Sequence, residues 1–150
     1  MRLTSMTDYA MRLLMYVGQH PDRLCNIAEV ARAYSISEPH LMKITNKLAQ
    51  RGWLMTVRGK NGGMRLNRDP ADINLGAVVR DMESDLNLVE CFATGSTCTL
   101  RGTCGLTAIL EGALQQFLGH LDRYTLADIL PQPAQWAPEH VRTIRLVKSD

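Results

Sequence analysis

Apolar residues recur every three or four positions over much of the chain, which is the spacing of one face of an α-helix. The first such segment runs from Thr4 to Gly18, and Ser5 and Thr7 are its candidate N-terminal caps. Shorter helical patterns follow at residues 72–82 and 126–130. The sequence therefore predicts a mainly α fold.

Residues 26–52 carry the pattern of two short helices joined by a tight turn. Asn26 followed by Glu29 is a capping box that opens the first helix, and Ser37 caps a second helix with Pro39 in its first turn. The second helix has an apolar inner side and a basic outer side. This arrangement is typical of a helix-turn-helix DNA-binding unit. The residues expected on the basic outer side are His40, Lys43, Lys47 and Arg51.

A glycine-rich, basic hairpin follows these two helices. Short apolar stretches at Trp53–Val57 and Met64–Asn67 predict two strands, and Arg58–Gly63 supplies the turn between them. Because glycines remove side-chain bulk, Arg58 and Lys60 on this turn can approach a DNA backbone or a minor groove closely. Together with the preceding helices, the small β-hairpin predicts a winged helix-turn-helix.

The most regular apolar pattern lies between Leu106 and Leu121, where apolar residues follow the i, i+3, i+4, i+7, i+8 series. A small domain could bury such a stripe against its own core. We expect instead a long dimerisation helix that packs on a second copy of the chain, because sequence-specific helix-turn-helix proteins usually act as dimers. Thr125 is expected to cap a final helical turn, and the Pro-rich tail beyond it receives no function.

Cys91, Cys98 and Cys104 lie in a loop rich in Gly, Ser and Thr, with six and five residues between them. Disulfides fit poorly, because three thiols leave one unpaired and the first residues show no secretory pattern. Zinc loops usually have gaps of about two to four residues, whereas wider gaps suit an iron–sulfur cluster. The spacing favours a cluster, and zinc remains the alternative. Cys25 stands apart and is expected to be a small buried hydrophobic residue.

The charge of the chain is unevenly distributed. Residues 1–68 hold eleven Lys and Arg against four Asp and Glu, a net charge of +7, whereas residues 69–150 hold six against eleven, a net charge of −5. A basic front half is typical of a protein that binds a polyanion. No apolar run reaches membrane-spanning length, and there is no nucleotide-binding glycine motif or nucleophile–base pair. We therefore expect a cytoplasmic DNA-binding protein with no membrane partner, and not an enzyme.

The chain resembles the Rrf2 family of bacterial winged-helix regulators, and within it the nitric-oxide-sensing repressors. The matching pieces are the start Met-Arg-Leu-Thr-Ser-Met-Thr-Asp-Tyr-Ala, the hairpin Val-Arg-Gly-Lys-Asn-Gly-Gly, the three-cysteine loop and the segment Leu-Asp-Arg-Tyr-Thr-Leu-Ala-Asp-Ile-Leu. The resemblance implies a homodimeric, cluster-dependent transcriptional repressor. Reaction of its cluster with nitric oxide would release it from the promoters of nitrosative-stress genes.

The resemblance also implies the metal ligands. In these repressors three cysteines, here Cys91, Cys98 and Cys104, hold a [4Fe-4S] cluster, and an aspartate from the partner subunit is the fourth ligand. That aspartate maps onto Asp8, which without the resemblance reads as a helix N-terminal charge. A second branch of the family senses iron–sulfur status or redox state through a [2Fe-2S] cluster, with a histidine three residues after the last cysteine. Thr107 occupies that position here, so the first branch is favoured and the second is the alternative.

For DNA binding, we expect the second helix of the helix-turn-helix to enter the major groove of double-stranded DNA and the wing to lie in or beside the minor groove. A two-fold dimer should bind an inverted-repeat operator whose half-sites lie about 34–36 Å, or a multiple of it, apart. Most contacts are expected at phosphates. The residues expected to contact DNA are Arg2, Thr4, Ser37, His40, Lys43, Lys47, Arg58 and Lys60.

These expectations divide the chain into four regions. Residues 1–82 form the winged helix-turn-helix, and residues 83–104 form the cluster-binding loop. Residues 105–130 form the dimerisation helix and the final helical turn, and residues 131–150 form the tail.

Overall fold

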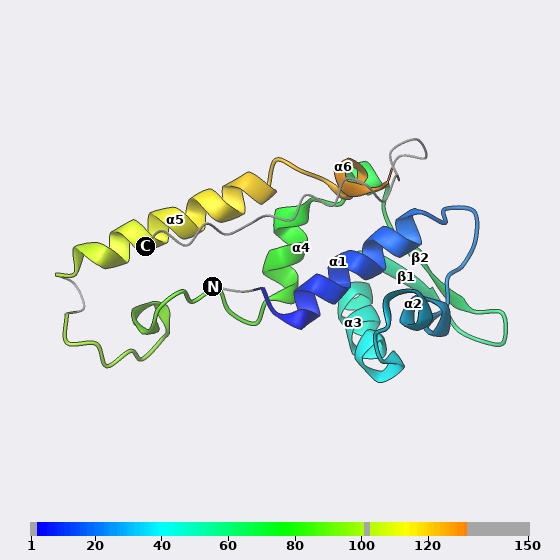
Figure 1. The fold of residues 1–150 in the computed structure, drawn as a ribbon, viewed down its shortest axis with the longest axis horizontal. Coiled ribbons are helices and arrows are strands. Elements are labelled where there is room, and N and C mark those ends of the chain that lie inside the picture. The colour runs from blue at the N-terminus through cyan, green and yellow to red at the C-terminus, as the bar shows by residue number, and fades with distance from the viewer. Residues whose placement is uncertain (1–2, 101–102, 132–150) are drawn as a thin grey trace, which may run out of the picture.

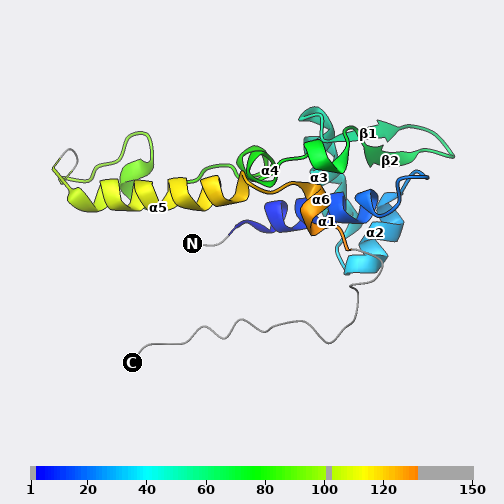
Figure 2. The same cartoon turned by 90° about the horizontal axis from the view of Figure 1, so that it is seen from above.

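The computed structural model describes residues 3–100 and 103–131, which form helices and one two-stranded antiparallel sheet. The first three helices, the sheet, α4 and α6 make a body, from which α5 projects as an arm (Figure 1, and from above in Figure 2). The mainly α fold with a small β-hairpin, predicted from the sequence as a winged helix-turn-helix, is confirmed. In chain order the elements are α1 (Ser5–Gly18), α2 (Ile27–Tyr34), α3 (Glu38–Gln50), β1 (Leu54–Val57), β2 (Gly63–Leu66), the 3-10 turn η1 (Pro70–Asp72), α4 (Leu75–Met82), the 3-10 turn η2 (Glu90–Phe92), α5 (Gly105–Leu121) and α6 (Leu126–Ile129).

The cap of α1 differs from the expected one. Thr4 is the N-cap, and its side chain accepts a hydrogen bond from the Thr7 N–H at 3.4 Å, so the prediction of Ser5 or Thr7 as the cap is wrong. Thr7 is fully buried, and its hydroxyl donates to the carboxylate of Glu83. The Thr7 hydroxyl does not cap the helix because it is hydrogen-bonded to Glu83, a residue far along the chain.

The helix-turn-helix forms as its capping residues predict. Asn26 accepts a hydrogen bond from the Glu29 N–H at 2.9 Å, and the Glu29 carboxylate accepts one from the Asn26 N–H at 3.0 Å, which confirms the capping box. Ser35 follows α2 with φ at 55°, in the left-handed region, and turns the chain toward α3. Ser37 is the N-cap residue of α3, without a side-chain capping bond, and Pro39 lies in the first turn.

The wing is an antiparallel hairpin that is anchored to the body at its base. β1 and β2 pair along their full length. Met64 of β2 also exchanges two backbone hydrogen bonds with Cys25, at 2.8 and 2.9 Å, so the segment before α2 lies beside the hairpin. This approach requires glycine at position 63, because a Cβ there would lie 2.6 Å from the Cys25 carbonyl oxygen. The base of the wing is therefore fixed, while its tip points away from the helices (Figure 1).

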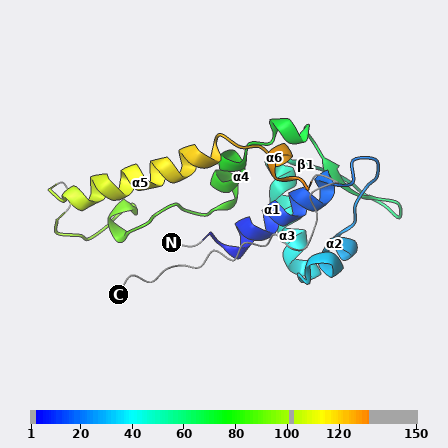
Figure 3. The same cartoon turned by 45° about the horizontal axis from the view of Figure 1, so that its top comes forward.

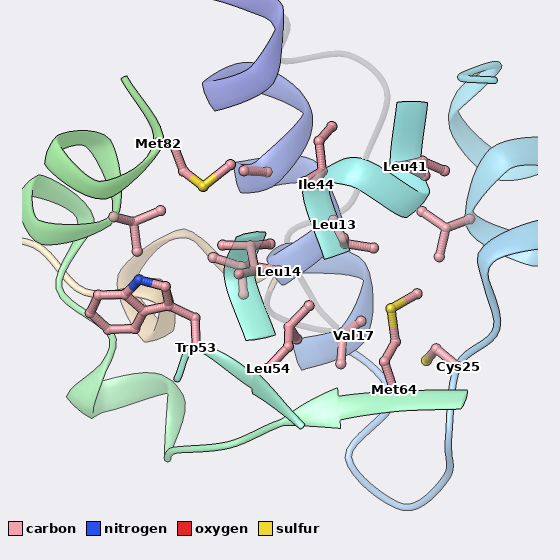
Figure 4. Packing of buried hydrophobic residues seen from close by; sticks show 14 of the residues in the cluster. Leu13, Leu14, Val17, Cys25, Leu41, Ile44, Trp53, Leu54, Met64 and Met82 are labelled. Carbon is pink, nitrogen blue, oxygen red and sulfur yellow. The ribbon is translucent and has the colours of Figure 1, made fainter. Parts of the chain in front are cut away.

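One apolar core joins α1, α3, the sheet and α4 (Figure 4). On α1 and α3 its members recur at three- and four-residue spacing, as the sequence pattern predicts. Trp53 at the start of the wing donates its indole N–H to the Asp81 carboxylate of α4 at 2.8 Å. Truncating a large core side chain to alanine typically costs about 2–5 kcal/mol, so these residues are needed to hold the helices and the sheet together. The core includes Leu13, Leu14, Val17, Leu41, Ile44, Leu48, Trp53, Leu54, Met64 and Met82.

After α5, the chain returns to the body through α6. Thr125 and Asp128 form a capping box at its start, which confirms Thr125 as the cap. Leu126 is fully buried, and its N–H donates to the Ile73 carbonyl oxygen at 2.8 Å. The final helical turn therefore packs on the winged helix-turn-helix and not on α5.

α5 extends from Gly105 to Leu121, as predicted, and its apolar face is exposed near its start and half-buried toward its end. Among the residues of this helix, Leu118 alone is buried, whereas Leu106 is 57% and Ile109 is 70% exposed. The exposed part of the apolar stripe is therefore its start, whereas Leu110, Leu114, Phe117 and Leu121 are half-buried.

Candidate metal centre and nucleic-acid interface

The loop cysteines lie at the end of α5 that is far from the body (Figures 1 and 3). Cys91 belongs to η2, and Cys104 directly precedes α5. All three loop cysteines are half-buried free thiols, so they are partly accessible to solvent. This is the chemical form from which metal-binding thiolates arise.

Thr107 in the first turn of α5 joins two of these thiols. Its hydroxyl oxygen lies 3.6 Å from the sulfur of Cys91. The N–H and hydroxyl of Thr107, together with the N–H of Leu106, lie beside the Cys104 thiol and lower its pKa, because they stabilise the thiolate. The start of α5 therefore gathers two sulfurs and favours the ionised form of one of them.

The third thiol lies elsewhere in the loop. Cys98 donates its backbone N–H to the Ser96 hydroxyl at 3.3 Å. Within residues 3–100 and 103–131, no three side chains of His, Cys, Asp or Glu stand close enough together to share a metal ion. As a donor set, three thiols suit an iron–sulfur cluster. One chain thus supplies three suitable thiols, and those of Cys91 and Cys104 are already neighbours. In the described residues these thiols do not form a complete set of metal ligands.

Asp8 lies on the exposed side of the first turn of α1, in the body. Its carboxylate pairs with the Arg12 guanidinium, with Oδ2 2.9 Å from Nη2 and Oδ1 3.3 Å from Nε. All three overall views place the cysteine loop at the opposite end of α5 from the body that carries α1 (Figures 1, 2 and 3). Asp8 therefore does not join the cysteines of its own chain in this arrangement.

Glu83, at the C-cap of α4, holds the start of α1 in place. Its carboxylate accepts hydrogen bonds from the Thr4 N–H at 2.8 Å, the Thr4 hydroxyl at 3.2 Å and the buried Thr7 hydroxyl. Sequence reasoning missed this contact. A signal was nonetheless present, because a carboxylate at a helix C-terminus opposes the helix dipole and needs donors from elsewhere. Glu83 thus connects the segment leading to the cysteine loop with the helix that carries Asp8.

The expected DNA-contacting residues of α3 divide into two groups. Ser37 and Lys43 are exposed, as a surface facing DNA requires. His40 is half-buried and packs edge-to-face on Tyr9 of α1, with ring centroids 5.1 Å apart. Lys47 is also half-buried, and its ammonium donates to the Met82 carbonyl oxygen at 2.8 Å. The outward face of α3 is therefore less basic than the sequence suggested.

The wing tip carries Arg58 and Lys60, both exposed. Between them Gly59 has φ at 110°, and a Cβ at Gly62 would lie 2.1 Å from the Val57 carbonyl oxygen, so the tight turn depends on glycine. Thr4 is occupied by the capping and Glu83 contacts at the start of α1. Arg2, the remaining expected DNA contact, lies outside the described residues.

Cys25 belongs to the core and not to the loop. It is fully buried between the body helices and β2 (Figure 4), and burial raises the pKa of its thiol to about 11. A thiol in such surroundings stays protonated and inert. The interpretation of Cys25 as a small buried hydrophobic residue is confirmed.

A winged helix-turn-helix with an exposed basic wing is the architecture of a DNA-binding transcription regulator. Residues 3–132 match the model of the family described as Rrf2, iron-dependent transcriptional regulator. The chain belongs to the Rrf2 family and is a transcriptional regulator.

Individual relatives agree with this assignment. The chain is similar to the HTH-type transcriptional regulator NsrR of Bacillus subtilis strain 168, with 47% identity over 132 residues, covering 87% of this chain and 90% of the relative. The NsrR of Geobacillus kaustophilus is 48% identical over 136 residues, covering 89% and 92%. Among solved structures, T. potens IscR superposes with a TM-score of 0.69 at 24% identity over 85% of each chain, which supports the fold. In the described part of the chain, the helices are too short or too polar to cross a membrane.

Proposed function

We propose that this regulator is a cluster-dependent repressor that responds to nitric oxide. Cys91, Cys98 and Cys104 of one chain would hold a [4Fe-4S] cluster, with Asp8 of the partner subunit as the fourth ligand. The observation that carries the proposal is the separation of these groups, since two thiols meet at Thr107 while Asp8 lies in the body. The similarity to relatives named NsrR points to the same branch of the family.

The exposed apolar residues at the start of α5 support a homodimer. Leu106 and Ile109 are large apolar residues exposed on one helix, and an extended exposed apolar surface marks an interaction site. In a two-fold dimer each subunit would give its cysteines to one site and its Asp8 to the other. The dimer contact and the completion of both metal centres are then a single event.

Such a ligand set would hold one iron through a hard carboxylate oxygen, a more weakly bound ligand than thiolate, and so would supply the position at which nitric oxide binds. The carboxylate of Asp8 has two possible partners, the metal centre of the other subunit or Arg12 of its own helix. The Arg12 guanidinium lies 5.8 Å from the centroid of the Tyr9 ring, and Tyr9 packs on His40 of α3. A change of partner at Asp8 can therefore reach the DNA-binding helix through two packed side chains.

On DNA, Ser37 and Lys43 of α3 would lie in the major groove, and Arg58 and Lys60 would lie in or beside the minor groove. These basic groups would contact mostly phosphates, which supplies affinity and orientation. His40 and Lys47 would contact DNA only after leaving Tyr9 and Met82, so we propose for them a role in positioning α3.

Complementation between two defective chains tests the ligand assignment. An Asp8→Ala chain and a Cys104→Ala chain are each expected to purify anaerobically without a full cluster. When the two are co-expressed with different tags and the mixed dimer is isolated, one of its two sites has three cysteines facing an intact Asp8 from the partner subunit. We expect that dimer to bind four irons and four sulfides, half the content of the wild-type dimer.

Other outcomes of this experiment would overturn parts of the proposal. A mixed dimer without iron would place Asp8 in the same site as its own cysteines. A full cluster in the Asp8→Ala homodimer would place Asp8 outside the metal centre. Two irons per site, with no response to nitric oxide, would support the [2Fe-2S] alternative. A colourless wild-type protein with stoichiometric zinc would exclude both clusters.

A further inference from the structure

The outward face of α3 carries mainly uncharged side chains. His40 and Lys47 contact Tyr9 and Met82 of the body, and a stripe of other residues on α3 is exposed. Its members recur at three- and four-residue spacing, so they form one line along the helix. They are Pro39, Met42, Lys43, Asn46 and Gln50.

Asn46 has a position that the fold does not explain. Asparagine disfavours the middle of a helix, because its side chain competes with the backbone hydrogen bonds. Three other asparagines have structural partners: Asn26 and Asn74 cap helices, and Asn67 donates to the Gly52 carbonyl oxygen. Among the hydrogen bonds of the described residues, none involves the Asn46 side chain, which is exposed on α3. Its amide is therefore available to a ligand.

Met42 is the apolar neighbour of Asn46, one helical turn earlier. It is 53% exposed, whereas Leu41 and Ile44, on the opposite face of α3, are fully buried in the core. Lys43 lies beside it and supplies positive charge on the same exposed face. Asn46 thus has an apolar side chain, Met42, and a basic side chain, Lys43, one helical turn before it. Such a surface suits an approach to the edges of base pairs, where phosphates and bases are both within reach.

We propose that Asn46 and Met42 read A·T base pairs in the major groove. An asparagine side chain can donate its amide N–H to N7 of adenine and accept a hydrogen bond from the N6 amino group with its oxygen, and an apolar side chain can contact the methyl group of thymine. The spacing of one helical turn allows the two residues to read adjacent base pairs of one half-site. This inference deepens the proposed function, since it rests on DNA binding by α3, but it does not depend on the cluster or on nitric oxide.

Selection from a random double-stranded DNA library tests the inference with the full chain, purified anaerobically. The wild type is expected to select an inverted repeat with a fixed A·T pair in each half-site. Asn46→Ala should lose the preference at that pair and bind the wild-type motif about tenfold or more weakly. Lys43→Ala is the comparison variant, expected to weaken binding to all sequences alike and to reduce its salt dependence. Since Asn46 is exposed, its replacement should not lower the thermal midpoint.

Replacing thymine with deoxyuridine, which lacks the methyl group, tests Met42 separately. At one thymine beside the adenine read by Asn46, this change should weaken wild-type binding about fourfold, the effect of one buried methyl group. Met42→Ala should bind both DNAs equally. If Asn46→Ala selects the wild-type motif unchanged, or if Met42→Ala still distinguishes thymine from deoxyuridine, the base-reading roles are wrong. If the wild type selects no motif at all, sequence-specific repression itself fails.

Discussion

The carboxylate of Asp8 and the guanidinium of Arg12 form an ion pair one turn apart on α1, with Oδ2 and Nη2 2.9 Å apart. Both side chains are nearly half exposed, so the pair adds little to the stability of the fold. The pair matters instead for the proposed metal site. If Asp8 is a ligand of the partner's cluster, Arg12 competes for the same carboxylate.

Removing Arg12 is therefore expected to favour the cluster-bound state. An exposed pair of this kind is worth about 0.2–1 kcal/mol, and Arg12→Ala takes that interaction away from the cluster-free state. We expect cluster retention in the presence of an iron chelator to rise by up to about fivefold, followed by visible absorbance. Arg12→Lys keeps the positive charge and should stay near the wild type. Weaker retention in Arg12→Ala would show that Arg12 supports the bound state instead.

The four cysteines should separate into two classes. In cluster-free native protein near pH 8, iodoacetamide is expected to modify Cys91, Cys98 and Cys104 and to spare Cys25, because Cys25 is buried and its pKa is raised to about 11. Denaturant should expose the fourth thiol. Mass spectrometry of the digested protein measures each site. Fast modification of Cys25 in the native protein would contradict its place in the core.

The wing should be needed for DNA binding and not for the cluster. Arg58→Ala is expected to abolish repressor binding to the operator while iron and sulfide content stay unchanged, because Arg58 is exposed at the wing tip and far from the cysteine loop. Arg123→Ala, which removes an exposed arginine after α5, is the control and should bind normally. An Arg58→Ala protein with normal operator affinity would refute the role of the wing.

Loss of Glu83 should loosen the start of α1. Glu83→Ala leaves the buried Thr7 hydroxyl without its acceptor, which is expected to lower the free energy of unfolding by about 1–3 kcal/mol. Glu83→Gln retains an acceptor and should lose less. Chemical denaturation of cluster-free protein measures both variants. Equal stability of wild type and Glu83→Ala would mean that the hydrogen bonds of Glu83 to α1 do not contribute to the free energy of unfolding.

The ion pair between Arg80 and Asp122 predicts part of the acid sensitivity. Hydrogen bonds from Arg80 lower the pKa of the Asp122 carboxyl, so the pair stabilises the fold above the ordinary pKa of about 4. That contribution is lost as the pH falls through the lower folded-state pKa. Asp122→Asn should therefore flatten the acid side of the stability profile, measured by thermal unfolding between about pH 5 and pH 2. An unchanged profile would contradict this contribution.

Local signals were enough to predict much of the fold. The capping box at Asn26, the cap position of Ser37 and the glycine-rich wing depend on residues within a few positions of one another, and all three formed as predicted. The same holds for the long apolar helix before Thr125.

Contacts between distant residues were beyond the sequence patterns. The hydroxyl of Thr7 is taken up by Glu83, 76 positions away, and the ammonium of Lys47 by the Met82 carbonyl, 35 positions away. From the sequence alone, Thr7 could equally be a helix cap and Lys47 could equally contact a phosphate. Only the tertiary packing of the chain decides which partner each side chain has. For the same reason the meeting of two thiols at Thr107 depended on how the loop folds back onto α5.

The proposed function requires that nitric oxide react with a cluster and thereby release the regulator from DNA. The most direct measurement titrates nitric oxide into anaerobically purified protein bound to its operator, following cluster absorbance and DNA affinity in the same sample. We expect about four irons and four sulfides per chain at the start, as a [4Fe-4S] cluster requires, and loss of DNA affinity in step with bleaching. DNA affinity that persists after the cluster has reacted would contradict it.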